Sequence, residues 1–92
     1  MDITDWRKKI DELDLKLVQL LNERTHCAVE IGKLKRQLQQ QLYDPDREGQ
    51  VFENVQRANR GPLRPDAVQR LFERIIDEAR RAARLAMGEE KT

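Results

Sequence analysis

Arg24 and Lys35 are two cations whose spacing could build an anion-binding site on one helix. Eleven residues separate them, which is three helical turns to within about 20°, so both side chains leave the same flank. An apolar repeat runs through this stretch, so the flank faces packed side chains. Burying a guanidinium without an anion costs on the order of several kcal/mol. We therefore expect a negative group between these two cations.

Ordinary roles for the same two residues stay open. Arg24 can extend outward past its apolar neighbours or pair with a nearby carboxylate, and Lys35 can be a solvated residue on the flank. Helix periodicity alone favours these ordinary roles. The choice between them and an anion site depends on residues further along the chain.

A second polar cluster follows in the segment Asp44-Pro45-Asp46-Arg47-Glu48. Proline directly after an aspartate cap is typical of the start of a helix. Capping and the helix dipole account for Asp44 and Asp46, but they do not account for Arg47. Asp44, Arg47 and Glu48 would then gather at the first turn, where they can bind both a carboxylate and a hydroxyl.

Arg7 is a third candidate cation, but it cannot join Arg24 from the same helix. Seventeen residues separate the two, which puts Arg7 about 100° off the seam and some 25 Å away along the axis. If both serve one site, Arg7 must come from a second copy of the chain. A solvated arginine near the N-terminus is the simpler interpretation when Arg7 is considered alone.

A long amphipathic helix from Asp5 to about Leu38 must position these cations. Thr4 is its expected N-cap. Gly32 lies inside the helix, and either the close approach of another group or a tolerated imperfection would explain a glycine there. Such a helix is roughly 50 Å long, whereas a lone compact chain of this size has a radius of gyration near 12 Å. Dimerisation along the helix is therefore expected. The heptad seam consists of Trp6, Ile10, Leu13, Leu17, Leu20, Arg24, Cys27, Ile31, Leu34 and Leu38.

Two shorter helices complete an all-α chain. The first runs from Pro45 to near Asn59, and the second starts near Pro65. The second has bulky apolar residues in its first half and alanines in its last half, which indicates close packing of the last half. Its arginines, expected mostly on the solvated face, are Arg70, Arg74, Arg80, Arg81 and Arg84. We expect one domain over residues 1–92, with a lead-in at 1–4 and a flexible tail at 88–92.

Composition excludes several function classes. A net charge of +1, from 18 basic and 17 acidic residues, argues against a general nucleic-acid binder. No apolar run approaches the roughly 20 residues of a membrane span. One cysteine, Cys27, cannot form an internal disulfide, and the single histidine, His26, cannot build a metal site with it. We therefore expect a cytoplasmic, metal-free protein that binds neither nucleic acid nor membrane.

Several of these segments, in this order, resemble the all-α chorismate mutase family. The resemblance covers residues 5 to 86 and is most specific in the segment 44–48. It implies an intertwined homodimer of three-helix chains with two active sites, each built from both protomers. The elements that carry the resemblance are Arg7, Arg24, Glu30-Ile31-Gly32-Lys33-Leu34-Lys35, Asp44-Pro45-Asp46-Arg47-Glu48, Leu71-Phe72 and Ile75-Ile76.

The resemblance also implies a reaction and a role for each site residue. The reaction is the pericyclic rearrangement of dianionic chorismate to prephenate, with no nucleophile, general base or cofactor. Arg7 of the partner protomer, Arg24 and Arg47 would bind the carboxylates, and Lys35 would donate to one carboxylate and to the ether oxygen. Asp44 and Glu48 would hold the hydroxyl region. Catalysis would rest on a held chair-like conformer and on cations facing the oxygen that gains charge, with Lys35, Arg24 and Glu48 as the catalytic residues.

Two positions of the third helix depart from the family pattern. Ala83 stands where the family usually has Gln or Glu hydrogen-bonded to the ether oxygen. Ala79, a smaller departure, stands where the family often has Ser or another small residue. Both are counted among the expected substrate-binding positions. Losing one transition-state donor costs about 3 to 4 kcal/mol, so weakened activity is expected.

Two alternative functions remain open at this point. One is an enzyme of the same fold acting on isochorismate, as a pyruvate-lyase, or on an amino analogue of chorismate. The other is a weakly active or non-catalytic dimeric module that partners an aromatic-pathway enzyme, and Ala83 is its best support.

Overall fold

The computed structural model describes residues 1–88 as three helices with no strand among them. The order is α1 (Ile3–Gln37), α2 (Pro45–Ala58) and α3 (Pro65–Ala86). The all-α, three-helix fold predicted from the sequence is therefore confirmed. The tail expected at 88–92 lies outside the described residues, apart from Gly88. Within residues 1–88, no helix has both the length and the apolar character needed to cross a membrane.

Helix α1 begins earlier than the sequence predicted, and Thr4 is not its N-cap. The cap is Asp2, whose carboxylate accepts from the backbone N–H of Asp5 at 2.9 Å, while the Asp5 carboxylate accepts from the N–H of Asp2 at 3.1 Å. A reciprocal cap needs an acceptor three residues after the capping residue. Counting from Thr4 that residue is Arg7, which can only donate. Half of the expected lead-in, Ile3 and Thr4, is consequently helical.

Helices α2 and α3 begin where the sequence placed them. Asp44 caps α2 by accepting from the N–H of Arg47 at 3.1 Å, and Pro45 occupies the first turn. α3 begins at Pro65, where Arg70 and Arg64 bind the carboxylate of Asp66 and lower its pKa. Asn59 orders the turn between them, since its amide donates to the carbonyl of Leu63 and its oxygen accepts from the N–H of Gly61, both at 2.9 Å.

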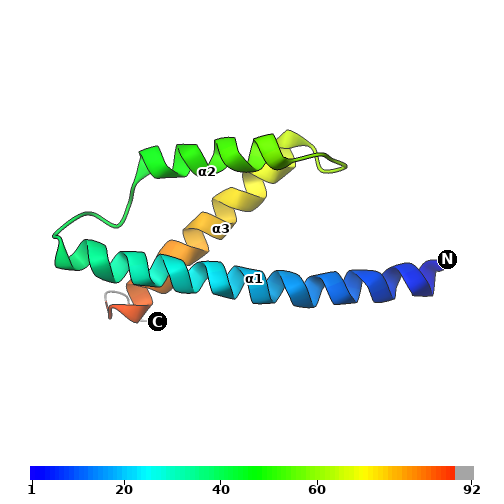
Figure 1. The fold of residues 1–92 in the computed structure, drawn as a ribbon, viewed down its shortest axis with the longest axis horizontal. Helices are drawn as coiled ribbons and strands as arrows, with labels where there is room; N and C mark the ends of the chain where they lie inside the picture. Colours follow the sequence, from blue (N-terminus) through cyan, green and yellow to red (C-terminus); the bar gives the residue numbers. More distant parts are fainter. Residues whose placement is uncertain (89–92) are drawn as a thin grey trace.

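Helix α3 connects the other two helices. It crosses the C-terminal half of α1 and packs against α2, whereas α2 and α1 do not pack directly on each other (Figure 1). The buried hydrophobic residues among those described are small, and they all belong to α3: Val68, Ala79 and Ala83. A pocket lined by residues of all three helices lies between them.

Gly32 is the contact point between α1 and α3. A Cβ built on Gly32 would lie 3.3 Å from the Cβ of Ala83 and 3.2 Å from Cδ1 of Leu42. Of the two explanations open for this glycine, close approach of another element is therefore the correct one. The alanine-rich half of α3 packs closely, as predicted, and its partner is α1.

The N-terminal half of α1 extends away from the rest of the molecule (Figure 1). The radius of gyration is 16.1 Å and the longest dimension 54 Å, against about 12 Å expected for the radius of a compact chain of this length. Half or more of the surface of each of its apolar seam residues is exposed: Trp6, Ile10, Leu13, Leu17 and Leu20.

Candidate active site

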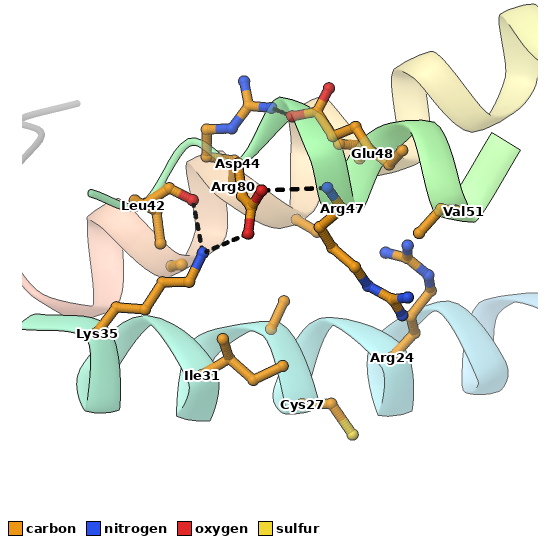
Figure 2. A pocket seen from close by; sticks show the side chains of 14 residues that line it. Arg24, Cys27, Ile31, Lys35, Leu42, Asp44, Arg47, Glu48, Val51 and Arg80 are labelled. Carbon is orange, nitrogen blue, oxygen red and sulfur yellow. Dashed lines mark hydrogen bonds and ion pairs between the residues drawn. The ribbon is translucent and has the colours of Figure 1, made fainter. Parts of the chain in front are cut away.

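A pocket of about 250 Å³ lies where the three helices converge (Figure 2). It contains seven of the eight residues that the sequence nominated for the site, the exception being Arg7. Their roles stay predictions, but their convergence from three separate helices is a feature of the fold. The seven residues are Arg24, Lys35, Asp44, Arg47, Glu48, Ala79 and Ala83.

Helix α1 supplies one wall with both of its spaced cations. Arg24 and Lys35 line the pocket together with Ile31, as their eleven-residue spacing predicts. The side chain of Lys35 is 21% exposed, and its Nζ lies 3.7 Å from Oδ2 of Asp44 and 3.4 Å from the carbonyl oxygen of Leu42. Lys35 therefore ties α1 to the loop that leads into α2.

The first turn of α2 supplies the opposite wall. Asp44 caps this helix through Oδ1 and faces Lys35 through Oδ2, so one carboxylate orders the helix start and pairs with a cation. Arg47 extends toward α1, and its Nη1 donates to the neutral Oε1 of Gln50 at 3.3 Å. Glu48 lies one residue further along the same turn.

Arg24 and Arg47 approach each other at one end of the pocket (Figure 2). Within residues 1–88 neither guanidinium has a carboxylate within 4.0 Å. Two like charges directed into one pocket repel each other unless an anion lies between them. The sequence predicted a negative group between Arg24 and Lys35. Asp44 supplies one for Lys35, whereas Arg24 has no carboxylate within 4.0 Å in residues 1–88.

Helix α3 contributes an apolar floor. Ala79 is 5% exposed and Ala83 is 1% exposed, and both line the pocket beside Ile76. Neither alanine offers a side-chain hydrogen bond. The two departures from the family pattern thus leave the floor without a donor at these positions.

Arg80 is the charged pocket residue that the sequence reasoning left out of the site. It was placed mostly on the solvated face, but its side chain is 19% exposed, lines the pocket and donates to Oε2 of Glu48. Arg84, expected there too, is half-buried, whereas Arg70, Arg74 and Arg81 are exposed as predicted. Arg80 lies one helical turn after Ile76 on the flank of the apolar stripe, which is the signal that could have identified it.

Arg7 is far from the pocket of its own chain. It belongs to the extended half of α1, some 25 Å along the helix axis from Arg24. Cys27, by contrast, is a lining residue of the pocket, although its free thiol points away from the cavity (Figure 2).

The chain is similar to known chorismate mutases over most of its length. The family described as chorismate mutase type II matches residues 6–84. The chain is 37% identical over 75 residues to the bifunctional chorismate mutase/prephenate dehydratase of Pseudomonas aeruginosa, a match covering 76% of this chain and 20% of that protein. It is 34% identical over 55 residues to the chorismate mutase of Methanocaldococcus jannaschii, covering 60% of this chain and 56% of that one.

A solved structure shares the fold. The chorismate mutase of Thermus thermophilus, in its form II, superposes with a TM-score of 0.82 at 31% identity, covering 84% of this chain and 88% of that one. The bifunctional relatives are much longer, since this chain spans only about a fifth of their length.

Proposed function

The chain belongs to the chorismate mutase type II family, and we propose that it catalyses the rearrangement of chorismate to prephenate. The observation that carries this proposal is the pair of guanidinium groups, Arg24 and Arg47, that enter one pocket without a carboxylate partner among the described residues. Chorismate carries two carboxylates. A dianion placed between these cations and Lys35 would relieve their repulsion and form charge-assisted hydrogen bonds.

The proposed mechanism needs positioning and electrostatics but no covalent step. One carbon–oxygen bond breaks and one carbon–carbon bond forms within the same molecule, so no proton or group is transferred to the protein. Arg24 and Arg47 would hold the carboxylates in the compact conformer that brings the reacting carbons together. Lys35 would donate to the ether oxygen as negative charge develops on it, and Asp44 and Glu48 would accept from the hydroxyl.

We propose further that the active form is an intertwined homodimer. The extended half of α1 exposes a continuous apolar seam that a single chain leaves uncovered. A second copy packed along the seam would bury it, at about 25 cal/mol per Å² of apolar surface. The same arrangement would bring Arg7 of the partner to the pocket and supply a third uncompensated cation.

The decisive experiment follows chorismate consumption and prephenate formation by absorbance with purified protein. We expect a rate proportional to protein concentration, lower than that of a family member with a donor at the position of Ala83. Arg24→Ala should abolish most of the rate, whereas Arg74→Ala, on the exposed face of α3, should preserve it. A folded protein without any conversion would contradict the proposed activity.

The buried alanine floor favours a second candidate, a non-catalytic binding module. That candidate predicts a protein that binds chorismate or prephenate without converting either. Isochorismate and an amino analogue of chorismate, supplied as substrates in place of chorismate, test the alternative enzyme activities of this fold. The bifunctional names of several relatives support association with a prephenate-consuming enzyme, and a cytoplasmic location stays a prediction.

A further inference from the structure

Arg80 is fixed on three sides at the edge of the pocket. Its Nη2 donates to Oε2 of Glu48, its Nη1 lies 3.7 Å from Oδ1 of Asp77, and its guanidinium carbon lies 4.9 Å from the centre of the Tyr43 ring. These partners come from α2, from α3 itself and from the loop that precedes α2. These three contacts distinguish Arg80 from an arginine that lies on a solvated helix face.

The contact with Glu48 bridges α3 to the first turn of α2. Helix α2 packs on α3 but not on α1, so side chains alone link the pocket wall formed by Asp44, Arg47 and Glu48 to α1. Lys35–Asp44 is one of these contacts, and Arg80–Glu48 is the other ion pair in the pocket. Figure 2 shows Arg80 and Glu48 together on the side of the pocket away from α1.

We propose that Arg80 is a positioning residue that acts through Glu48 and sets the affinity of the site for its dianionic substrate. Glu48 is 23% exposed and lines a pocket that must receive two negative charges, so its own charge opposes binding. Arg80 cancels this charge and holds the carboxylate on the α3 side. The substrate then meets Arg24 and Arg47 without a competing anion, while Oε1 of Glu48 remains to accept from the substrate hydroxyl. This role rests on the proposed function.

A double-mutant cycle on purified full-length protein tests this role. KM and kcat for chorismate are measured for the wild type, Arg80→Met, Glu48→Gln and the double variant. Because hydrogen bonds to charged groups are worth enough to change an equilibrium tenfold or more, Arg80→Met should raise KM about tenfold, with a smaller change in kcat. In the Glu48→Gln background, where no charge is left to cancel, the same substitution should change KM less than about threefold.

Two further variants separate charge from structure. Arg80→Lys keeps the cation and should keep KM within about threefold of the wild type. Arg74→Met removes an arginine from the exposed face of the same helix and should leave KM unchanged. Circular dichroism and melting temperature accompany every variant, and if Arg80→Met does not fold, Arg80→Ala carries the same comparison in both backgrounds.

The outcomes distinguish this role from the proposed function. Equal increases of KM in both backgrounds, or no increase in either, would overturn the action of Arg80 through Glu48 while chorismate conversion by the wild type stands. If the wild type binds chorismate without converting it, the proposed activity is contradicted. The same cycle is then measured with dissociation constants in place of KM. A wild type that neither converts nor binds chorismate overturns both.

Discussion

At the scale of single residues, the cations of the pocket differ in whether a carboxylate lies close to them. Lys35 and Arg80 each have a carboxylate within 4.0 Å in the pocket, whereas Arg24 and Arg47 have none among the described residues. The two guanidinium groups approach each other and repel, and a bound anion would relieve this repulsion. A residue placed for ligand binding should therefore cost stability in the free protein, and this is testable.

We expect Arg24→Ala to weaken binding of dianionic ligands while leaving the fold intact or more stable. Loss of a charge-assisted contact with a carboxylate corresponds to about 1.5 to 3 kcal/mol, or roughly ten- to a hundredfold in affinity. Calorimetric titration with prephenate and a melting curve measure the two effects, with Arg74→Ala as the control. A substantially lower melting temperature with unchanged affinity would show that Arg24 is structural.

The floor of the pocket gives a second prediction at this scale. Ala83→Gln should raise kcat more than it changes KM, because the added donor strengthens its bond as charge develops on the ether oxygen. Ala83 is 1% exposed and faces Gly32, so the larger side chain should also cost about 1 to 3 kcal/mol of stability.

Ala83→Leu is the matched control for that substitution, since it adds a side chain of comparable length without a donor. It should lower the melting temperature similarly without raising kcat. An equal gain in kcat from leucine would show that filling the floor matters and that the hydrogen bond does not. An unchanged rate in Ala83→Gln would mean that another residue already supplies the donor.

At the scale of the helices, the crossing of α1 and α3 depends on two small residues. Gly32 and Ala83 let the helices approach closely, and Lys35 and Arg24 lie on α1 on either side of this crossing. A change in the crossing would therefore move both cations relative to α2. Arg36 supports the same crossing, since its Nη1 donates to the carbonyl of Met87 at 2.9 Å.

We expect Gly32→Val to destabilise the protein by about 1 to 3 kcal/mol through overpacking, despite the helix propensity it gains. Gly49→Ala is the control, because a Cβ at Gly49 in α2 meets nothing within 4 Å. It should stabilise the protein by about 0.5 to 1 kcal/mol. Urea unfolding of the two variants measures both shifts, and a stabilising Gly32→Val would show that the crossing is looser than its distances indicate.

At the scale of the whole molecule, the single chain is elongated and incompletely packed. Its longest dimension of 54 Å is close to the length of α1 alone, about 52 Å for 35 residues. The apolar seam on the N-terminal half of this helix lies outside the contacts with α2 and α3. A partner of the same sequence, related by a two-fold axis, would offer a seam of matching length.

The predicted dimer with shared sites can be tested by complementation. Arg7→Ala and Arg24→Ala homodimers should each have little activity, because every site in them lacks one cation. A heterodimer made by refolding the two together has one site with both defects and one intact site, so about a quarter of the wild-type activity should return in a statistical mixture, where half the dimers are mixed.

Sedimentation equilibrium at micromolar concentration accompanies this experiment. It should give twice the monomer mass of 10.9 kDa. A compact monomer would contradict the dimer itself, whereas a dimer without recovered activity would show that Arg7 and Arg24 serve the same protomer's site or separate functions.

The sequence by itself determined the three helices and most members of the pocket. Helix periodicity placed Arg24 and Lys35 on one flank, and the Asp44-Pro45 start placed Arg47 and Glu48 in one first turn. These are local features, since they depend on residues within a few turns of each other. The order of the motifs along the chain then indicated the family, and with it the pocket that brings the motifs together.

Only the tertiary structure decided the partners of Arg80 and the reason for Gly32. A long arginine side chain takes its direction from the groups it can reach, and for Arg80 these are Glu48, 32 residues earlier in the chain, and Tyr43. A glycine likewise reveals its purpose only when the helix that crosses it is in place. Both depend on contacts distant in sequence, which periodicity and capping rules do not encode.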